Sequence, residues 1–93
     1  MTTYAVLFNW TEQGIKNYKD SPSRVEAARQ AWAGTDIQIK DIYWTLGAHD
    51  LVGIVEAPND ETLTRALLAL GAQGNVRTTT LRAFSAEEFA KLA

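Results

Sequence analysis

The feature that most constrains the fold is the apolar run Tyr4–Phe8, which has no polar side. A run this short, rich in aromatic and branched side chains, is typical of a β-strand rather than a helix. Successive strand residues point to opposite faces, so Tyr4, Val6 and Phe8 share one face while Ala5 and Leu7 share the other. Because neither set is polar, both sides of the sheet that contains this strand require a cover.

The rest of the chain divides into short elements separated by turn residues. Ser21 and Pro22 predict a helix start, because serine caps free amides and proline fits the first helical turn. Residues 10–20 show no steady period and predict a loop or irregular turn, with some helix allowed. The expected strands cover residues 3–9, 37–46, 51–57 and 76–84. The expected helices cover 22–33, the stretch capped at Asn59–Asp60 that ends at Gly71, and a short tail behind the capping box Ser85–Glu88.

The resulting order, βαββαβ, predicts an α+β ferredoxin-like domain that spans residues 1–93 and contains a four-stranded antiparallel sheet. Its two helices can shield only one face of the sheet. The simplest cover for the other apolar face is the same face of a second copy, related by a two-fold axis. The sequence therefore predicts a homodimer in the form of a dimeric α/β barrel, or a higher oligomer built from such dimers.

Composition excludes several classes of function. The chain has 93 residues, no cysteine, and nine Lys plus Arg against eleven Asp plus Glu. The absence of thiols fits a reducing compartment, so we expect a cytoplasmic protein. No cationic excess is available for nucleic acid, and no apolar run is long enough for a membrane span. One histidine without cysteine cannot build a confident transition-metal site, and no cofactor motif is present, so we expect neither metal nor cofactor.

Three loops should converge where the first strand ends, because that strand lies antiparallel to both of its expected neighbours. They bring together the densest group of site-type residues in the chain. These are Asn9, Trp10 and Glu12 after the first strand, His49 and Asp50 in the central hairpin, and Arg77 at the start of the last strand.

We assign candidate catalytic roles to His49, Asp50 and Glu12. An imidazole exchanges protons near neutral pH, and a carboxylate can orient it. His49 and Asp50 are adjacent and point apart, so Glu12 or Asn9 is the better expected partner for the imidazole. The alternative is that both hairpin residues only form the turn.

We assign candidate ligand-binding roles to Asn9, Trp10 and Arg77. The indole would stack on an apolar or aromatic ligand, while Asn9 and Arg77 would hold its oxygens. The alternatives are ordinary packing for Trp10 and a solvated or ion-paired strand face for Arg77. Tyr43, Trp44 and Trp32 are expected in the core or the dimer interface.

Three ordered stretches resemble the GYD domain family of small bacterial proteins: Asn9–Ile15, Tyr43–Gly47 and Gly74–Thr78. The resemblance extends over nearly the whole chain. The family is named for a glycine, tyrosine, aspartate signature, and here Gly47-Ala48-His49-Asp50 places histidine where tyrosine is expected. The resemblance implies a ferredoxin-like fold in a dimeric α/β barrel and says little about activity.

Two functional hypotheses follow. The first is a homo-oligomeric protein that binds a small apolar or aromatic organic molecule at the exit of the first strand; whether it also converts that molecule, as a cofactor-free enzyme, is left open. The second is a non-catalytic assembly or regulatory module, whose motifs serve turn geometry and the interface between sheets, since glycine marks turns as readily as ligand approach.

Overall fold

The computed structural model describes residues 1–93 as one sheet with four helices and a 3-10 turn. The chain order is β1 (Thr2–Trp10), α1 (Glu12–Lys16), η1 (Tyr18–Asp20), α2 (Ser21–Trp32), β2 (Gln38–Trp44), β3 (Leu51–Ala57), α3 (Asp60–Ala72), β4 (Val76–Ala83) and α4 (Ala86–Leu92). None of these helices combines the length and hydrophobicity that a membrane span requires.

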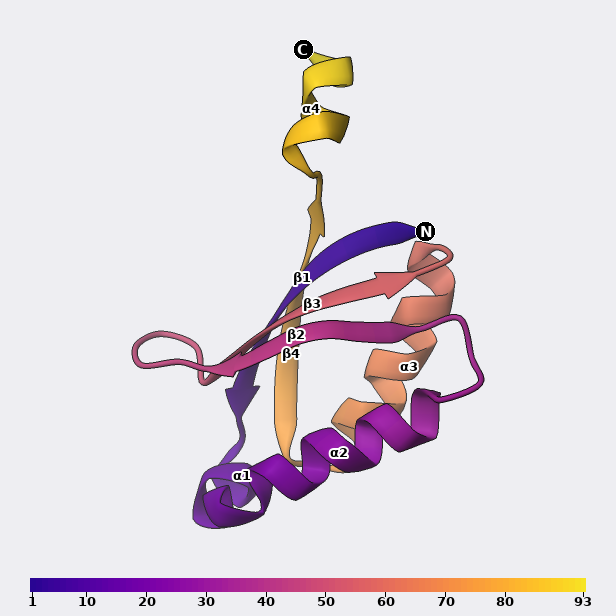
Figure 1. Ribbon diagram of the computed structural model, residues 1–93. Coiled ribbons are helices and arrows are strands. Elements are labelled where there is room, and N and C mark those ends of the chain that lie inside the picture. The colour runs from indigo at the N-terminus through magenta and orange to yellow at the C-terminus, as the bar shows by residue number, and fades with distance from the viewer.

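The four strands form one antiparallel sheet in the order β2-β3-β1-β4. The two central strands, β1 and β3, are flanked by β2 on one edge and β4 on the other. This arrangement, with α2 and α3 as the connections between strands, confirms the predicted α+β ferredoxin-like fold (Figure 1).

One face of the sheet is covered by the long helices. Tyr4, Val6 and Phe8 of β1 are buried in a core that also contains Leu63 and Leu67 of α3. Trp32 and Val25 of α2 pack against the same core. The alternation of β1 places Tyr4, Val6 and Phe8 on one face, as the sequence pattern predicts, and the structure shows that this is the face under the helices.

The opposite side of the sheet, which we call the open face, carries Ala5 and Leu7 of β1, and no helix lies over it in Figure 1. The strand register extends it sideways, because Ala5 pairs with Ile54 and Leu81, and Leu7 pairs with Val52. Two polar residues share this mainly apolar face: Thr79 opposite Leu7 and Asp41 opposite Ile54. Tyr43 of β2 pairs with Val52 and continues the surface. Leu81 is 49% exposed and Tyr43 63% exposed.

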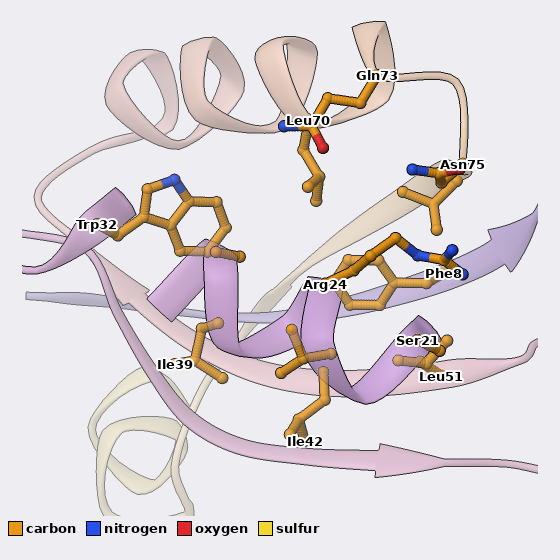
Figure 2. Close-up of a pocket in the computed structure, with 13 residues that line it drawn as sticks. Phe8, Ser21, Arg24, Trp32, Ile39, Ile42, Leu51, Leu70, Gln73 and Asn75 are labelled. Carbon is orange, nitrogen blue, oxygen red and sulfur yellow. The ribbon is translucent and has the colours of Figure 1, made fainter. Parts of the chain in front are cut away.

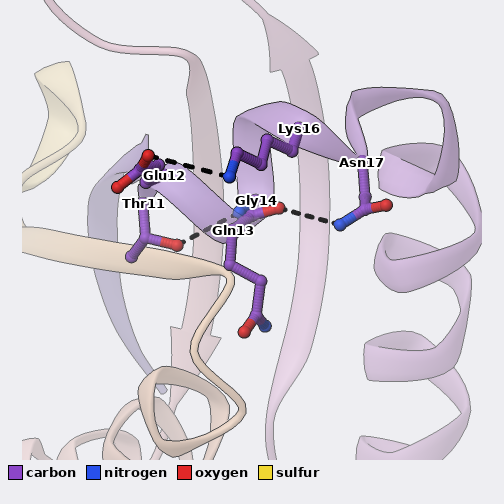
Figure 3. Close-up of polar contacts among 6 residues, drawn as sticks. All are labelled: Thr11, Glu12, Gln13, Gly14, Lys16 and Asn17. Carbon is purple, nitrogen blue, oxygen red and sulfur yellow. Dashed lines mark hydrogen bonds and ion pairs between the residues drawn. The ribbon is translucent and has the colours of Figure 1, made fainter.

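The region between β1 and α2 is more ordered than the sequence pattern suggests. Residues 12–16 form a short helix whose N-cap, Thr11, accepts a hydrogen bond from the Gly14 amide at 3.1 Å, and residues 18–20 form η1 (Figure 3). Ser21 does not cap α2. It is the first helical residue and is buried, and its hydroxyl accepts a hydrogen bond from the Trp44 indole at 2.9 Å.

The terminal helix α4 stands clear of the sheet beyond the end of β4 (Figure 1). Its predicted capping box is confirmed: the Ser85 hydroxyl accepts from the Glu88 amide at 3.0 Å, and the Glu88 carboxylate accepts from the Ser85 amide at 2.9 Å. Phe89 and Leu92 are 59% and 64% exposed. The helix thus has a strong local start and an uncovered apolar side.

Candidate functional site

The three predicted loops do meet where β1 ends. Asn9 is the link to the β2–β3 hairpin: its side-chain amide donates to the Ala48 carbonyl at 2.8 Å. Its carbonyl oxygen lies 2.7 Å from His49 Nδ1. Because the Asn9 amide nitrogen is engaged as a donor, its oxygen is the acceptor in this pair and the imidazole donates from Nδ1. Of the two partners considered for His49, the structure therefore selects Asn9.

Asp50 performs a different task from the one assigned to it as a partner for histidine. Its carboxylate accepts a hydrogen bond from the Trp10 backbone amide at 2.8 Å. Its own amide donates to the Phe8 carbonyl at 2.8 Å. Asp50 therefore binds the end of β1 to the hairpin from both its backbone and its side chain.

Glu12, the other expected partner, forms no hydrogen bond or ion pair with His49. The structure pairs its carboxylate with Lys16 at 3.8 Å, one turn later on α1 (Figure 3). The Glu12 side chain is 86% exposed. An exposed pair of this kind contributes at most about 0.5 kcal/mol, so its role in the isolated chain is that of a helix-surface pair.

The third loop packs tightly against the segment that follows β1. The Thr11 amide donates to the Asn75 carbonyl at 3.0 Å, and the Thr11 hydroxyl donates to the Gly74 carbonyl at 2.5 Å. A Cβ on Gly14 would lie only 2.0 Å from the Asn75 carbonyl oxygen. Gly74 itself has a φ of +88°, a conformation that favours glycine. We call this contact between residues 11–14 and residues 74–75 the junction.

The sheet separates the predicted ligand-binding residues into two groups. Trp10 lies opposite Val76 and packs against the covered core, where its indole N–H is buried without a hydrogen-bond partner. Asn9 is one residue earlier and therefore belongs to the open face, where it lies directly opposite Arg77. Asn9, His49 and Arg77 are thus neighbours in the isolated chain, and Trp10 lies on the other side of the sheet.

No cavity of the chain is lined by Asn9, His49 or Asp50. An apolar pocket lies between α2, α3 and the covered face, with Trp32, Ile39 and Leu70 among its lining residues (Figure 2). Its volume is about 50 Å³. Pockets for small organic ligands typically measure about 300–1,000 Å³, so this one suits a few water-sized guests.

Two ionisable groups are shifted by their surroundings, and neither belongs to the predicted site. Burial raises the pKa of Tyr4, and the hydrogen bond from its hydroxyl to Asp60 at 2.5 Å raises it further. Hydrogen bonds from the Ser85 amide and hydroxyl lower the pKa of Glu88. Both shifts accompany structural contacts: one attaches β1 to the start of α3, and the other caps α4.

Sequence reasoning missed three of these contacts. The Tyr4–Asp60 and Trp44–Ser21 hydrogen bonds join residues 56 and 23 positions apart, and no local pattern announces them. Gly14 stands in a run without periodicity and could have been read only as a flexible residue. The signal that marks it, close approach of another backbone, exists only in the folded chain.

The fold and the junction define a ferredoxin-like α+β protein whose motifs hold the end of β1 in place. The GYD domain family model matches residues 4–93, and the chain belongs to that family. Two of the three stretches that carry the resemblance in the sequence contain these contact residues: Asn9–Ile15 includes Asn9 and Gly14, and Gly74–Thr78 includes Asn75.

The chain is 33% identical over 84 residues to the glutamine synthetase and cystathionine beta-lyase binding protein of Thermus thermophilus, covering 89% of this chain and 88% of that protein. Among solved structures, TTHA0845, also from Thermus thermophilus, is 32% identical, with a TM-score of 0.54 over 92% of this chain and 96% of that one.

Two further structures are similar in fold alone. FFRP-DM1 superimposes with a TM-score of 0.60 at 19% identity, over 90% of this chain and 100% of that one. A hypothetical protein from Pyrococcus horikoshii, PHS023, superimposes with a TM-score of 0.56 at 17% identity, over 91% of this chain and 92% of that one.

Proposed function

We propose that the chain is a non-catalytic assembly or regulatory module that works as a homodimer and binds other proteins. The observation that carries this proposal is the open face. It contains the apolar residues Ala5, Leu7, Val52, Ile54 and Leu81, extended by Tyr43, and it has no cover in the chain; Asp41, opposite Ile54, and Thr79, opposite Leu7, are polar residues on the same face. Such surfaces on small domains mark sites of association, and a two-fold axis lets one face cover its own copy.

The terminal helix supports self-association. Its seven residues are too few to be stable alone in water, where helices shorter than about 12 residues are marginal. Phe89 and Leu92 nevertheless point away from any cover in their own chain. A second copy packed against the open face brings a surface close enough for α4 to bury these side chains.

Protein partners are supported by the relative from Thermus thermophilus, whose name states that it binds glutamine synthetase and cystathionine beta-lyase. The site geometry agrees with binding rather than catalysis. Asp50 is engaged with a backbone amide and Glu12 with Lys16, so neither carboxylate orients the His49 imidazole. We place the protein in the cytoplasm, because a chain without cysteines fits a reducing compartment, where disulfides are rare.

The direct test uses the two enzymes as probes. The purified chain is immobilised, and glutamine synthetase and cystathionine beta-lyase from Thermus thermophilus are passed over it in biolayer interferometry. We expect saturable binding of at least one enzyme, and weaker binding by the Ile54→Lys variant, because the proposed module works as a homodimer. An absence of binding by both enzymes would overturn the assignment of this partner class.

A second candidate, binding of a small organic molecule, is favoured by the cluster on the open face. Asn9, His49 and Arg77 lie together at one end of that face, and the imidazole Nε2 has no hydrogen-bond partner within the chain. In a dimer, the partner's face would lie over Asn9 and His49, while Arg77 stays at the β4 edge of the sheet. Trp10 would then support the site from the opposite side of the sheet rather than stack on the ligand.

Native mass spectrometry of freshly purified protein separates the two candidates. The module hypothesis predicts a homodimer, or a multiple of one, without added mass. A retained small molecule that is lost in the His49→Gln variant would favour the ligand hypothesis instead. A bare monomer would contradict both, because each depends on the covered open face.

A further inference from the structure

The two edges of the sheet differ in their protection against another strand. At β2, the register shifts between Ile39 and Asp41, and the Arg29 guanidinium donates to the Ile39 carbonyl at 3.0 Å. The same edge carries Lys40, paired with Glu56 at 4.0 Å. Bulges, charges and covering side chains are the usual means by which proteins block edge pairing. The β2 edge is therefore defended.

The edge at β4 has none of these devices along its centre. Its register with β1 runs without a shift from Ala83 to Val76, and the sheet ends there. The central residues, Thr78-Thr79-Thr80-Leu81, are uncharged, and threonine is a favourable strand residue. This straight, exposed strand has unpaired backbone groups that can receive one more strand.

A groove accompanies this edge along α3. One part, of about 400 Å³, is lined by Thr64, Leu68 and Gly71 of α3 and by Thr78 and Thr80 of β4. A second part, of about 280 Å³, continues past Thr64 and Thr80 toward Arg82. The α3 positions 64, 68 and 71 follow helical spacing and form one stripe. Leu68 in this stripe is 69% exposed.

Charge identifies the occupant. Strand β4 carries Arg77 and Arg82 and no acidic residue, although the whole chain has a net charge of −2. Neither arginine has a carboxylate within 4.0 Å, and Asp60, at the Arg82 end of the groove, is held by Tyr4. Pairing β4 with the β4 of a second copy would gather four arginines on two strands. A partner strand that carries carboxylates complements them instead.

We propose that the β4 edge and the α3 groove accept an extended, acidic segment of a partner protein as a fifth strand of the sheet. Main-chain hydrogen bonds to β4 supply affinity, and alternate side chains of the segment enter the groove beside Leu68. This proposal rests on the proposed protein-binding function and names the surface and the chemistry of the partner.

The test uses a fluorescein-labelled octapeptide of alternating Glu and Val, titrated with the full-length chain and followed by fluorescence anisotropy. Matched peptides replace every Glu by Lys, or carry N-methyl groups on the amides of one edge. We expect the Glu peptide to bind about tenfold or more tightly than the Lys peptide. N-methylation should reduce its affinity by about tenfold as well, because each methyl group removes a donor.

Variants of the protein localise the effect. Arg77→Glu should weaken binding of the Glu peptide by about tenfold and strengthen binding of the Lys peptide. Leu68→Asp should weaken binding of the Glu peptide, because the substitution places a carboxylate in the groove. Arg65→Glu is the matched control: it makes the same charge change on α3, outside the groove lining, and should leave the preference for the Glu peptide unchanged.

Equal affinity for the Glu, Lys and N-methylated peptides would overturn the proposal. So would a fall in the mass of the protein assembly when the peptide is added, because that would show a second copy on the β4 edge. Binding of the enzymes that is unaffected by Arg77→Glu and Leu68→Asp would refute this edge as the docking surface while leaving the protein-binding function intact.

Discussion

The end of β1 and the open face of the sheet differ in how many of their side chains find a partner within the chain. At the end of β1, Asn9, Thr11 and Asp50 each form hydrogen bonds to neighbouring loops at 2.5–3.0 Å. On the open face, apolar side chains such as Leu81 are left uncovered. One region is closed by its own contacts, and the other has no cover within the chain.

This contrast changes the meaning of the family motifs. A cluster of polar and aromatic residues in three converging loops is typical of a binding site, and equally of a region where three loops must be held together. Here the donors and acceptors of Thr11 and Asp50 are engaged within the chain. Capacity for a partner remains on the flat surfaces, where apolar groups and strand edges have no cover.

The largest effect is expected at the junction. Gly14→Ala places a methyl group 2.0 Å from the Asn75 carbonyl oxygen, a backbone atom that also binds the Thr11 amide. We expect a loss of about 3 kcal/mol or more in the free energy of unfolding, measured by urea denaturation. Gly34→Ala is the control: its φ is +80° with no atom within 4 Å, so it should cost only about 1 kcal/mol. Equal costs would show that the junction is not close-packed.

An intermediate effect is expected from the hydrogen bond that fastens β1 to α3. Tyr4→Phe removes the donor to Asp60 and should cost about 1 kcal/mol at neutral pH. Burial raises the Tyr4 pKa above 10.0, so the folded state holds this proton more tightly than the unfolded state. The contribution of this protonated hydroxyl to the free energy of unfolding is complete below pH 10 and is lost as the pH rises beyond it. Denaturation from pH 8 to 11 should therefore show a shallower alkaline decline for Tyr4→Phe; identical slopes would contradict this role.

A smaller effect is expected at the hairpin. His49→Gln removes the imidazole that donates to Asn9, while Asn9 keeps its bond to Ala48. We expect a cost of about 0.5 kcal/mol, within the usual range for surface substitutions, and no change in enzyme binding. Thermal melting and biolayer interferometry measure the two quantities. Loss of a retained small molecule in this variant would move the functional centre back to the end of β1.

The smallest effect is expected at α4. The hydrogen bonds from Ser85 lower the Glu88 pKa, so the cap is complete above the ordinary carboxyl pKa of 4.5 and weakens as the pH falls below it. Amide exchange of α4 measured between pH 3 and 6 should therefore accelerate in excess of the intrinsic rate at the acid end. Glu88→Gln should remove that excess, and an unchanged profile would show that the ionised cap does not hold the helix.

Much of the fold could be predicted because its signals are local. The Asn59 cap of α3 and the Ser85–Glu88 box of α4 depend on side chains within three residues of the amides they bind. The alternation in Tyr4–Phe8 sorted the side chains into two faces, since a strand has a fixed period, but only the structure shows which face the helices cover. The order of elements then determined the sheet topology.

The candidate site was less predictable because its geometry depends on contacts between distant segments. Asn9 and Trp10 are neighbours in sequence, and the pleat of β1 sends them to opposite faces. Ser21 is a residue type that often caps helices, but its hydroxyl accepts a hydrogen bond from the distant Trp44 indole. Ser21 is instead the first residue of α2. Sequence could place the loops together without deciding which side chains bind one another.

The most direct measurement of the central claim is sedimentation velocity of the native chain and of Ile54→Lys, which places an ammonium group on the open face opposite Ala5. Gln30→Lys, on the exposed side of α2, is the matched control. The mass obtained from sedimentation should be twice the 10.3 kDa chain mass for the native chain and the control, and equal to the chain mass for Ile54→Lys. A monomeric native chain, or an Ile54→Lys variant that remains dimeric, would contradict the account.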